Sequence, residues 1–301
     1  MTRDFGAALP AAEAQHPICI LSSGLFPARG HSTSQLMRRW IPFLKPARSV
    51  AVMRLSGIIA AGARGGLNDE KLAPVLERAF RRGKPDAVAL VLNSPGGSPV
   101  QSSLIGARIR RLAEERNVPV FAFVEDVAAS GGYWLAAAAD EIWVDESSVV
   151  GSIGVISSSF GLNEFISRHG VQRRVHTAGK SKSMLDPFQA EKPADVKRLK
   201  VLLEQIHDNF ITHVKTRRGD RLQPDADLFN GDIWVGARAL DVGLADGIGH
   251  VVPKMKERYG DKVRFRVYAP KRNFLQRFGT QVVSDALSGI EERAEYARFG
   301  L

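Results

Sequence analysis

Residues 87–97 read Ala-Val-Ala-Leu-Val-Leu-Asn-Ser-Pro-Gly-Gly, an apolar run that ends in a glycine turn. Six consecutive apolar residues predict a strand that is buried on both faces. The paired glycines Gly96 and Gly97 let the main chain approach a ligand without obstruction from a Cβ atom. An amphipathic helix is predicted to follow over residues 100–115. The stretch therefore predicts a strand, a functional turn and a helix in succession.

The same outline recurs along the chain, which predicts an α/β fold with polar loops at the carboxyl ends of the strands. A second glycine turn, Ala129-Ser-Gly-Gly-Tyr133, follows a strand expected over residues 118–124 and opens a helix that runs to about residue 139. Further strands are expected over residues 50–55, 141–144, 153–157 and 172–177, and helices over 69–82, 162–168, 194–217 and 282–297.

Composition and charge suggest one α/β domain with an additional segment at each end. Residues 1–48 mix Ala, Pro, Gly and Ser and predict a poorly ordered or basic arm, residues 49–252 the α/β domain, and residues 253–301 a helical extension. The formal net charge of +10 is spread along the helices, so no nucleic-acid partner is expected.

The chain lacks the signals of export and of a transmembrane helix. Cys19 is the only cysteine, and no run of about eighteen apolar residues occurs. Acidic residues interrupt the first apolar stretch, so no clear signal peptide is expected. We therefore expect a cytoplasmic protein, or one that rests peripherally on a membrane through the basic segment 37–48, which contains Trp40 and Phe43.

Ser130 is the candidate nucleophile, and two interpretations of it stay open. A serine between a strand and a helix is often an ordinary N-cap. A serine surrounded by small residues is also accessible to a carbonyl carbon, and the following helix offers free amides. The amides of Gly96 and Gly131 would then form a two-donor oxyanion hole.

The base is the next question. No metal-ligand spacing occurs, so neither a metal nor any other cofactor is expected. Among the histidines, His176 is the candidate, in a predicted strand. The loop Gly179-Lys-Ser-Lys-Ser-Met184 offers lysine instead, with apolar residues after Lys182. A lysine base must be neutral, and burial favours that form. The alternative interpretation of this loop is a solvated or phosphate-contacting surface.

Together these motifs resemble the signal peptide peptidase A family, the protease IV-type Ser–Lys peptidases related to ClpP and the crotonases. The similar segments are Asn93–Gly97, Ala129–Tyr133, Gly151-Ser-Ile-Gly-Val155, Gly179–Ser183 and Ala239–Gly249. The resemblance spans residues 49–252. It implies a ClpP/crotonase-like fold of repeated β-β-α units.

The resemblance also implies roles. Ser130 would be the nucleophile, Lys182 the general base, Ser152 the residue that holds the lysine amine, and Gly96 with Gly131 the oxyanion hole. Lys180 is the weaker candidate for the base. Family members form homo-oligomeric rings that share sites between subunits, so Ser130 and Lys182 of one chain are expected to lie apart. The substrates would be signal peptides or other small unfolded, apolar peptides.

Two alternatives share the predicted fold. A crotonase-type acyl-CoA enzyme would use the same backbone oxyanion hole but place carboxylates over the thioester, and Glu125 and Asp126 are the nearest acids. An inactive, ring-forming scaffold that binds peptides would need neither Ser130 nor Lys182.

Overall fold

The computed structural model describes residues 47–62, 66–179, 181–269 and 293–301. The chain divides into a unit of residues 1–46 and a compact unit that begins at Ala47. The predicted N-terminal arm, residues 1–48, therefore lies almost entirely outside the described residues.

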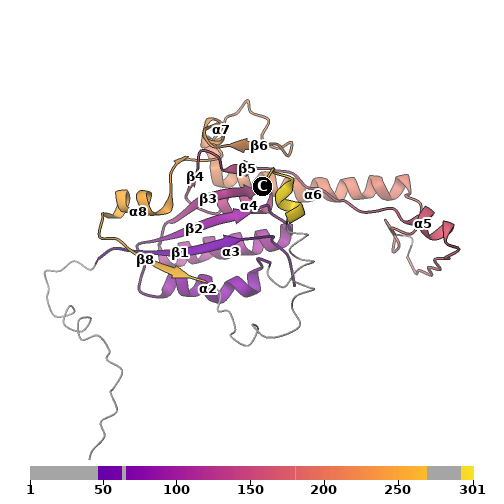
Figure 1. Cartoon of the computed structure of the whole chain (residues 1–301), viewed down its shortest axis with the longest axis horizontal. Coiled ribbons are helices and arrows are strands. Elements are labelled where there is room, and N and C mark those ends of the chain that lie inside the picture. Colours follow the sequence, from indigo (N-terminus) through magenta and orange to yellow (C-terminus); the bar gives the residue numbers. More distant parts are fainter. Residues whose placement is uncertain (1–46, 63–65, 180, 270–292) are drawn as a thin grey trace, which may run out of the picture. The chain divides into compact units, whose positions relative to one another are not determined.

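One mixed sheet organises the compact unit (Figure 1), in the order β6-β5-β3-β2-β1-β8, with β4 beside β3 and β7 beside β4. All of its strand pairs are parallel except β5 with β6. The strands are β1 (Ser49–Ser56), β2 (Ala87–Ser94), β3 (Val120–Ala129), β4 (Glu141–Val144), β5 (Val149–Gly151), β6 (Ile233–Val235), β7 (Gly247–Ile248) and β8 (Arg264–Tyr268). The predicted α/β class is confirmed.

Helices connect the parallel strands and cover both faces of the sheet (Figure 1). They are α2 (Asp69–Arg81), α3 (Pro99–Arg116), α4 (Gly131–Ala137), α5 (Asn163–Arg168), α6 (Pro193–Arg218), α7 (Ala237–Asp241) and α8 (Val251–Tyr259). As predicted, Asn68 caps α2, and its side-chain oxygen accepts a hydrogen bond from the Lys71 amide.

Alternation along the strands divides the core in two. Met53 and Leu55 of β1 pack with Leu76 of α2 and Ile109 of α3 on one face of the sheet. On β3, Val120 and Ala122 belong to the same core, whereas the alternating Phe121 and Phe123 pack with Met255 of α8 on the other face. Such burial on both faces explains why the central strands are almost wholly apolar.

Three expectations about the elements were wrong. Residues 153–157 and 172–177 form no strand, and the strand near the first of these is β5, which ends at Gly151. Residues 253–301 were expected to be a helical extension. Instead, β8 pairs with β1 at the edge of the sheet, and Met255 of α8 belongs to the core. Residues 270–292, which hold most of the predicted terminal helix, lie outside the described residues.

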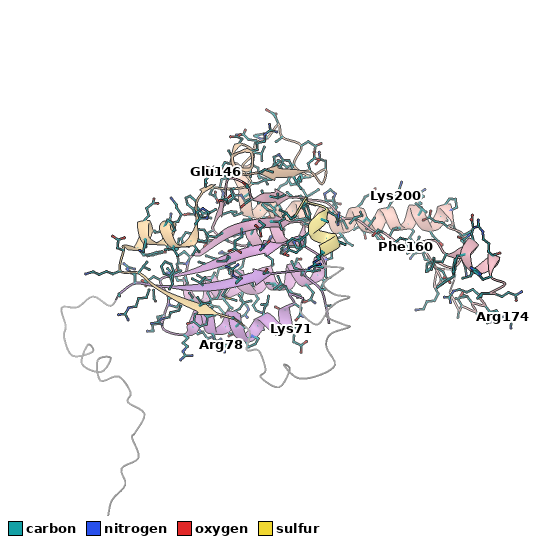
Figure 2. All side chains as sticks on the ribbon, in the orientation of Figure 1. Lys71, Arg78, Glu146, Phe160, Arg174 and Lys200 are labelled. Carbon is teal, nitrogen blue, oxygen red and sulfur yellow. The ribbon has the colours of Figure 1, made fainter. Side chains whose placement is uncertain are left out.

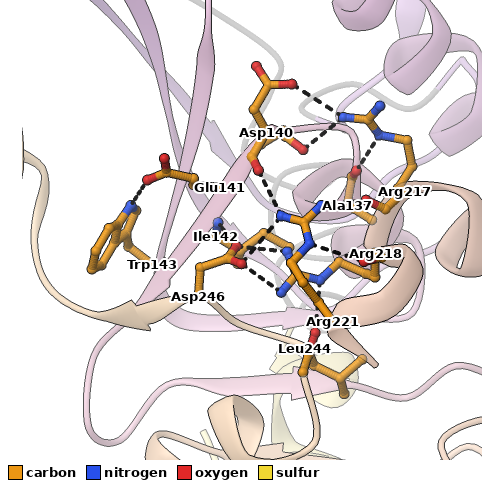
Figure 3. Close-up of polar contacts among 12 residues, drawn as sticks. Ala137, Asp140, Glu141, Ile142, Trp143, Arg217, Arg218, Arg221, Leu244 and Asp246 are labelled. Carbon is orange, nitrogen blue, oxygen red and sulfur yellow. Dashed lines mark hydrogen bonds and ion pairs between the residues drawn. The ribbon is translucent and has the colours of Figure 1, made fainter. Parts of the chain in front are cut away.

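The C-terminal half of α6 is fixed to the body by a group of arginines (Figure 3). Arg218 is 2% exposed and pairs with both carboxylate oxygens of Asp246, at 2.7 and 3.1 Å. Arg217 donates to the carbonyl oxygens of Ala137 and Ala139, both at 3.0 Å. Since two planar guanidinium groups hold it, this end of α6 has a defined direction.

Residues 155–205, which we call the arm, contain α5 and the first half of α6. Almost all of its side chains are exposed or half-buried. Figure 2 labels Phe160, Arg174 and Lys200 on the arm, and Figure 1 shows α5 well away from the sheet. The side chain of Phe160 is 84% exposed, and those of Ile156 and Phe165 are also largely exposed. The arm therefore presents apolar side chains to the solvent.

Within the described residues, no helix is both long and apolar enough to cross a membrane.

Candidate active site

Ser130 stands at a strained turn between β3 and α4. Its φ of 50° and ψ of −121° are rare for a residue with a side chain, and such a conformation costs about 1–3 kcal/mol. Two backbone bonds hold it: the Ser130 amide donates to the Gly151 carbonyl at 2.8 Å, and the Trp134 amide donates to the Ser130 carbonyl at 3.0 Å. The Ser130 hydroxyl makes no capping hydrogen bond. Ser130 therefore occupies the N-cap position of α4, but its side chain does not cap the helix.

The two glycine turns are in contact, and the positions at which they contact each other require glycine. A Cβ atom on Gly96 would lie 2.8 Å from the Ala129 carbonyl oxygen, the Gly131 amide nitrogen and the Ser130 Cβ. A Cβ atom on Gly132 would lie 2.4 Å from the Ser94 carbonyl oxygen. Real Cβ atoms do not approach backbone so closely, so this packing explains the paired glycines of both motifs.

The backbone amides near Ser130 differ in their hydrogen-bond acceptors. The Gly96 amide donates to Ser94 Oγ at 3.2 Å. Gly97 forms a bridge with Ile59, in which Ile59 donates to the Gly96 carbonyl and Ser98 donates to the Ile59 carbonyl, both at 2.7 Å. Within the described part of the chain, the Gly97 amide has no hydrogen-bond acceptor. The sequence pattern did not separate Gly97 from Gly96, because only the bridge with Ile59 distinguishes them.

Ser152 lies beside Ser130 because their strands are neighbours. Ala129 of β3 pairs with Gly151 of β5, and each of the two serines follows directly after its paired residue. Ser152 also has a positive φ of 50°. Its amide donates to the Asp232 carbonyl at 2.7 Å, and its carbonyl accepts from the Gly154 amide at 2.9 Å. The sheet register thus brings together two serines that are 22 residues apart.

Ser130 and Ser152 both line a cavity of about 830 Å³. Gly97 and Gly131 line the same cavity, whereas Gly96 does not. Its walls combine polar turns with apolar side chains, among them those of Trp134, Ile206, Phe210 and Phe229. A concave site of this size, in which convergent polar groups lie beside aromatic side chains, is a candidate ligand site.

The C-terminal residues of the chain lie at this cavity. Tyr296 and Phe299 pack on a small apolar group formed by Val127, Ala129 and Val149. The Tyr296 hydroxyl donates to the Asn93 carbonyl at 2.7 Å. Phe299 lines the cavity, as do Glu295 and Arg298. The structure thus brings the end of the printed sequence next to Ser130.

Lys182 is not brought to Ser130 within one chain. It lies on the arm, is exposed to solvent and does not line the cavity. No hydrogen bond joins Lys182 to Ser130 among the described residues. The neighbouring Ser181 is bonded to α6, since Arg198 donates to Ser181 Oγ at 3.0 Å. Lys180, the weaker candidate for the base, lies outside the described residues.

Among the described histidines, none is hydrogen-bonded to Ser130, and His207 lines the same cavity. His176 is exposed in an irregular segment of the arm and does not line the cavity. His207 and His213 of α6 each use Nε2 to bond a backbone carbonyl, that of Ile153 for His207 and that of Trp134 for His213, both at 3.0 Å. Within the described residues, no cluster of three or more His, Cys, Asp or Glu side chains could hold a metal ion.

Comparison with known proteins finds similarity to one peptidase family. Residues 113–259 match the model of peptidase family S49. The chain is 46% identical over 287 residues to a Brucella melitensis protein named Na(+)/H(+) antiporter NhaA, covering 88% of this chain and 39% of that protein. It is 29% identical over 248 residues to "Probable protease SohB" of Haemophilus influenzae, covering 80% of this chain and 67% of that protein.

A serine protease SPPA of Arabidopsis thaliana, a chloroplast protein, is 28% identical over 222 residues, covering 71% of this chain and 32% of that protein. A solved structure of a membrane-bound stomatin-specific protease gives a TM-score of 0.42 at 14% identity, covering 75% of this chain and all of the other. The chain thus spans 39% of the Brucella protein and a third of the plant protein, so their names describe chains that extend well beyond the match. The matched residues 113–259 include the turns at Ser130 and Ser152, and this part of the chain is similar to peptidase family S49 and to proteases named SppA and SohB.

Proposed function

We propose that this protein is a serine peptidase that cleaves small unfolded, apolar peptides, including signal peptides, with Ser130 as the nucleophile. The observation that carries the proposal is the Ser130 turn. Ser130 is half-buried and lines a cavity of about 830 Å³, its hydroxyl makes no capping hydrogen bond, and the same cavity is lined by Gly97, whose amide has no acceptor among the described residues. A strained turn that presents a serine in this way is typical of a nucleophile.

We assign the oxyanion hole to the amides of Gly131 and Gly97. The predicted pair was Gly131 with Gly96, but the Gly96 amide already donates to Ser94 Oγ. A Cβ atom placed on Gly131 would lie 3.4 Å from the Gly97 nitrogen, so the two amides are close neighbours. Two such donors would stabilise the charge that develops on the carbonyl oxygen during attack.

Lys182 is the proposed base, supplied by a second copy of the chain within a homo-oligomeric ring. Its exposure on the arm supports this, and among the described residues no lysine lines the cavity that holds Ser130. The exposed apolar side chains of the arm, among them Phe160 and Phe165, would be buried in such an assembly. Ser152, in the cavity with Ser130, would accept a hydrogen bond from the incoming amine.

The reaction is then an acyl transfer in two halves. The neutral lysine amine takes the Ser130 proton as Oγ attacks the peptide carbonyl, and the resulting oxyanion is held by the two amides. The ammonium returns the proton to the leaving amine as the C–N bond breaks, which leaves an ester on Ser130. Water attacks the ester in the same way, and the lysine again takes a proton and gives it back to Oγ.

The lining of the cavity supports apolar peptides as substrates. Trp134, Phe210 and Phe229 offer an apolar wall to a side chain bound next to the scissile bond. The acyl-CoA alternative loses its support, because neither Glu125 nor Asp126 lines the cavity. Glu125 instead pairs with Arg54, and Asp126 with the Asn93 side chain.

The test is hydrolysis of a fluorogenic apolar peptide by the wild type, Ser130→Ala and Lys182→Ala, with His176→Ala as the control. Both first variants should be inactive and the control fully active, and activity should rise with pH because the lysine must lose its proton. Mixing the two inactive variants should restore part of the activity if one site takes residues from two copies. An active Ser130→Ala variant would refute the proposal, and failure to restore activity would refute the shared site.

A further inference from the structure

Helix α6 contacts both serine turns of the candidate site through two histidines. His213 bonds the Trp134 carbonyl, in the first turn of the helix that follows Ser130. His207 bonds the Ile153 carbonyl, in the residue directly after Ser152. A carbonyl oxygen only accepts, so Nε2 of each imidazole carries the hydrogen and donates it.

Apart from the hydrogen bond from His207, the Ser152 turn makes few hydrogen bonds to the described part of the protein. Its backbone is strained, with a φ of 50° at Ser152 and of 103° at the preceding Gly151. The Asp232 carbonyl holds it on one side through the Ser152 amide, and after Gly154 the chain enters the arm without secondary structure. On the far side of the turn the Ile153 side chain is buried in the core, and His207 adds a hydrogen bond to the Ile153 carbonyl at the point where the chain leaves the body.

His207 also stands where α6 itself leaves the body. Toward the C-terminus from His207, Phe210, Val214 and Arg218 are buried. Toward the N-terminus, Val201 and Leu202 are exposed, and Arg198 bonds Ser181 beside Lys182. One helix thus holds the Ser152 turn of its own site and, at its other end, the segment that carries the proposed base.

We infer that His207 is a positioning residue for Ser152. By donating to the Ile153 carbonyl it keeps the strained turn in the conformation that directs Ser152 Oγ into the cavity. His207 lines the same cavity, and its Nε2–H is committed to the Ile153 carbonyl. This inference rests on the proposed function, since its effect is read through peptide hydrolysis.

The test compares His207→Gln, which keeps an N–H donor of similar reach, with His207→Leu and His207→Met, which have none. Removal of the donor should lower kcat by about tenfold with KM within about twofold of the wild type, whereas the glutamine variant should keep most of the activity. Having two donor-free variants keeps the comparison valid if one of them folds poorly, and thermal unfolding of each variant monitors folding.

A double-mutant cycle with Ser152→Ala distinguishes positioning from general support of the fold. If His207 acts through Ser152, then His207→Leu should lower kcat by less than about twofold in the Ser152→Ala background. The Ser152 hydroxyl that His207 positions is already missing from that variant. His213→Leu is the matched control, and its cost should be equal in both backgrounds. If Ser152→Ala hydrolyses the peptide too slowly to measure, the cycle instead uses the rate at which a fluorophosphonate labels Ser130.

The outcomes separate the two proposals. A wild type without peptidase activity, or an active Ser130→Ala variant, would refute the proposed function. If instead Ser130→Ala is inactive but His207→Leu costs the same with and without Ser152, or if the glutamine variant is as impaired as the leucine one, the positioning role is wrong while the peptidase stands.

Discussion

The imidazole of His213 lies flat on the indole of Trp134, with ring centroids 4.4 Å apart and an angle of 7° between the planes. Its Nε2 atom also donates to the Trp134 carbonyl at 3.0 Å. Burial lowers the pKa of His213 below its ordinary value, so the ring is neutral in the folded protein at pH 7. This pair joins the long helix α6 to α4, the helix that begins directly after Ser130.

The first prediction concerns pH. Because the pKa of His213 is lower in the folded state than in the unfolded state, the unfolded chain binds the extra proton first as the pH falls below about 6.5. The free energy of unfolding should therefore fall between pH 7.5 and pH 5.5, with a slope from this group of at most about 1.4 kcal/mol per pH unit. Urea titrations should show a smaller slope for His213→Gln.

The second prediction concerns the Arg218–Asp246 pair. Burial would raise the pKa of Asp246, but the bonds from Arg218 outweigh it and hold that pKa below its ordinary value. Arg218→Ala would leave a partly buried carboxylate without its main partner, and should lower the free energy of unfolding by about 3–5 kcal/mol. Arg168→Ala is the control, because Arg168 and its partner Glu164 are each 79% exposed and such pairs contribute at most about 1 kcal/mol. Equal losses in the two variants would contradict this account.

The third prediction concerns the contact of the two glycine turns. Gly96→Ala would drive a Cβ atom against the Ser130 turn and should lower kcat/KM by at least about tenfold, since small displacements of a nucleophile are costly. Gly170→Ala is the control, because Gly170 also has a positive φ, of 67°, but a Cβ atom there would meet nothing within 4 Å. That variant should lose about 1 kcal/mol of stability and no activity. Peptide hydrolysis and thermal unfolding distinguish the two effects.

The fourth prediction concerns the arm. Phe160→Ser should leave the thermal stability of the monomer unchanged, because the side chain is 84% exposed within one chain. It should weaken self-association, since an apolar side chain that is buried only between copies contributes about 1.5–3 kcal/mol. Sedimentation velocity over a range of concentrations measures this. The control is Val267→Ser, on β8 and 74% exposed, which should not alter the assembly. Unchanged self-association of Phe160→Ser would exclude this side chain from the interface.

Apolar runs and glycine turns predicted the central sheet well, because strands buried on both faces leave a strong signal. The runs at β1 and β2 and the helices α2, α3 and α6 lie within a few residues of their predicted positions. The alternating residues 172–177 also look like a strand, but within one chain they lie on the exposed arm and have no strand to pair with. Strand pairing depends on the neighbouring strand, and a local sequence pattern contains no information about that neighbour.

The site was only partly predictable for a similar reason. The motifs gave Ser130, Ser152 and the glycine pairs, and the sheet register does bring the two serines to one cavity. Sequence did not single out Gly97, because the choice between two adjacent amides depends on the bridge with Ile59. It also did not show that His207 and His213 each bond a carbonyl in a segment more than fifty residues away in the chain.

The packing of Phe299 beside Ser130 has a practical consequence for experiments on this protein. Any purification tag or reporter joined after Leu301 would begin within a few residues of the cavity. A short flexible tag of this kind is present at a local concentration in the millimolar range. Such a tag would act as a tethered competitor of the peptide under study and raise its measured KM. Kinetic work should therefore compare the tagged protein with protein from which the tag has been removed.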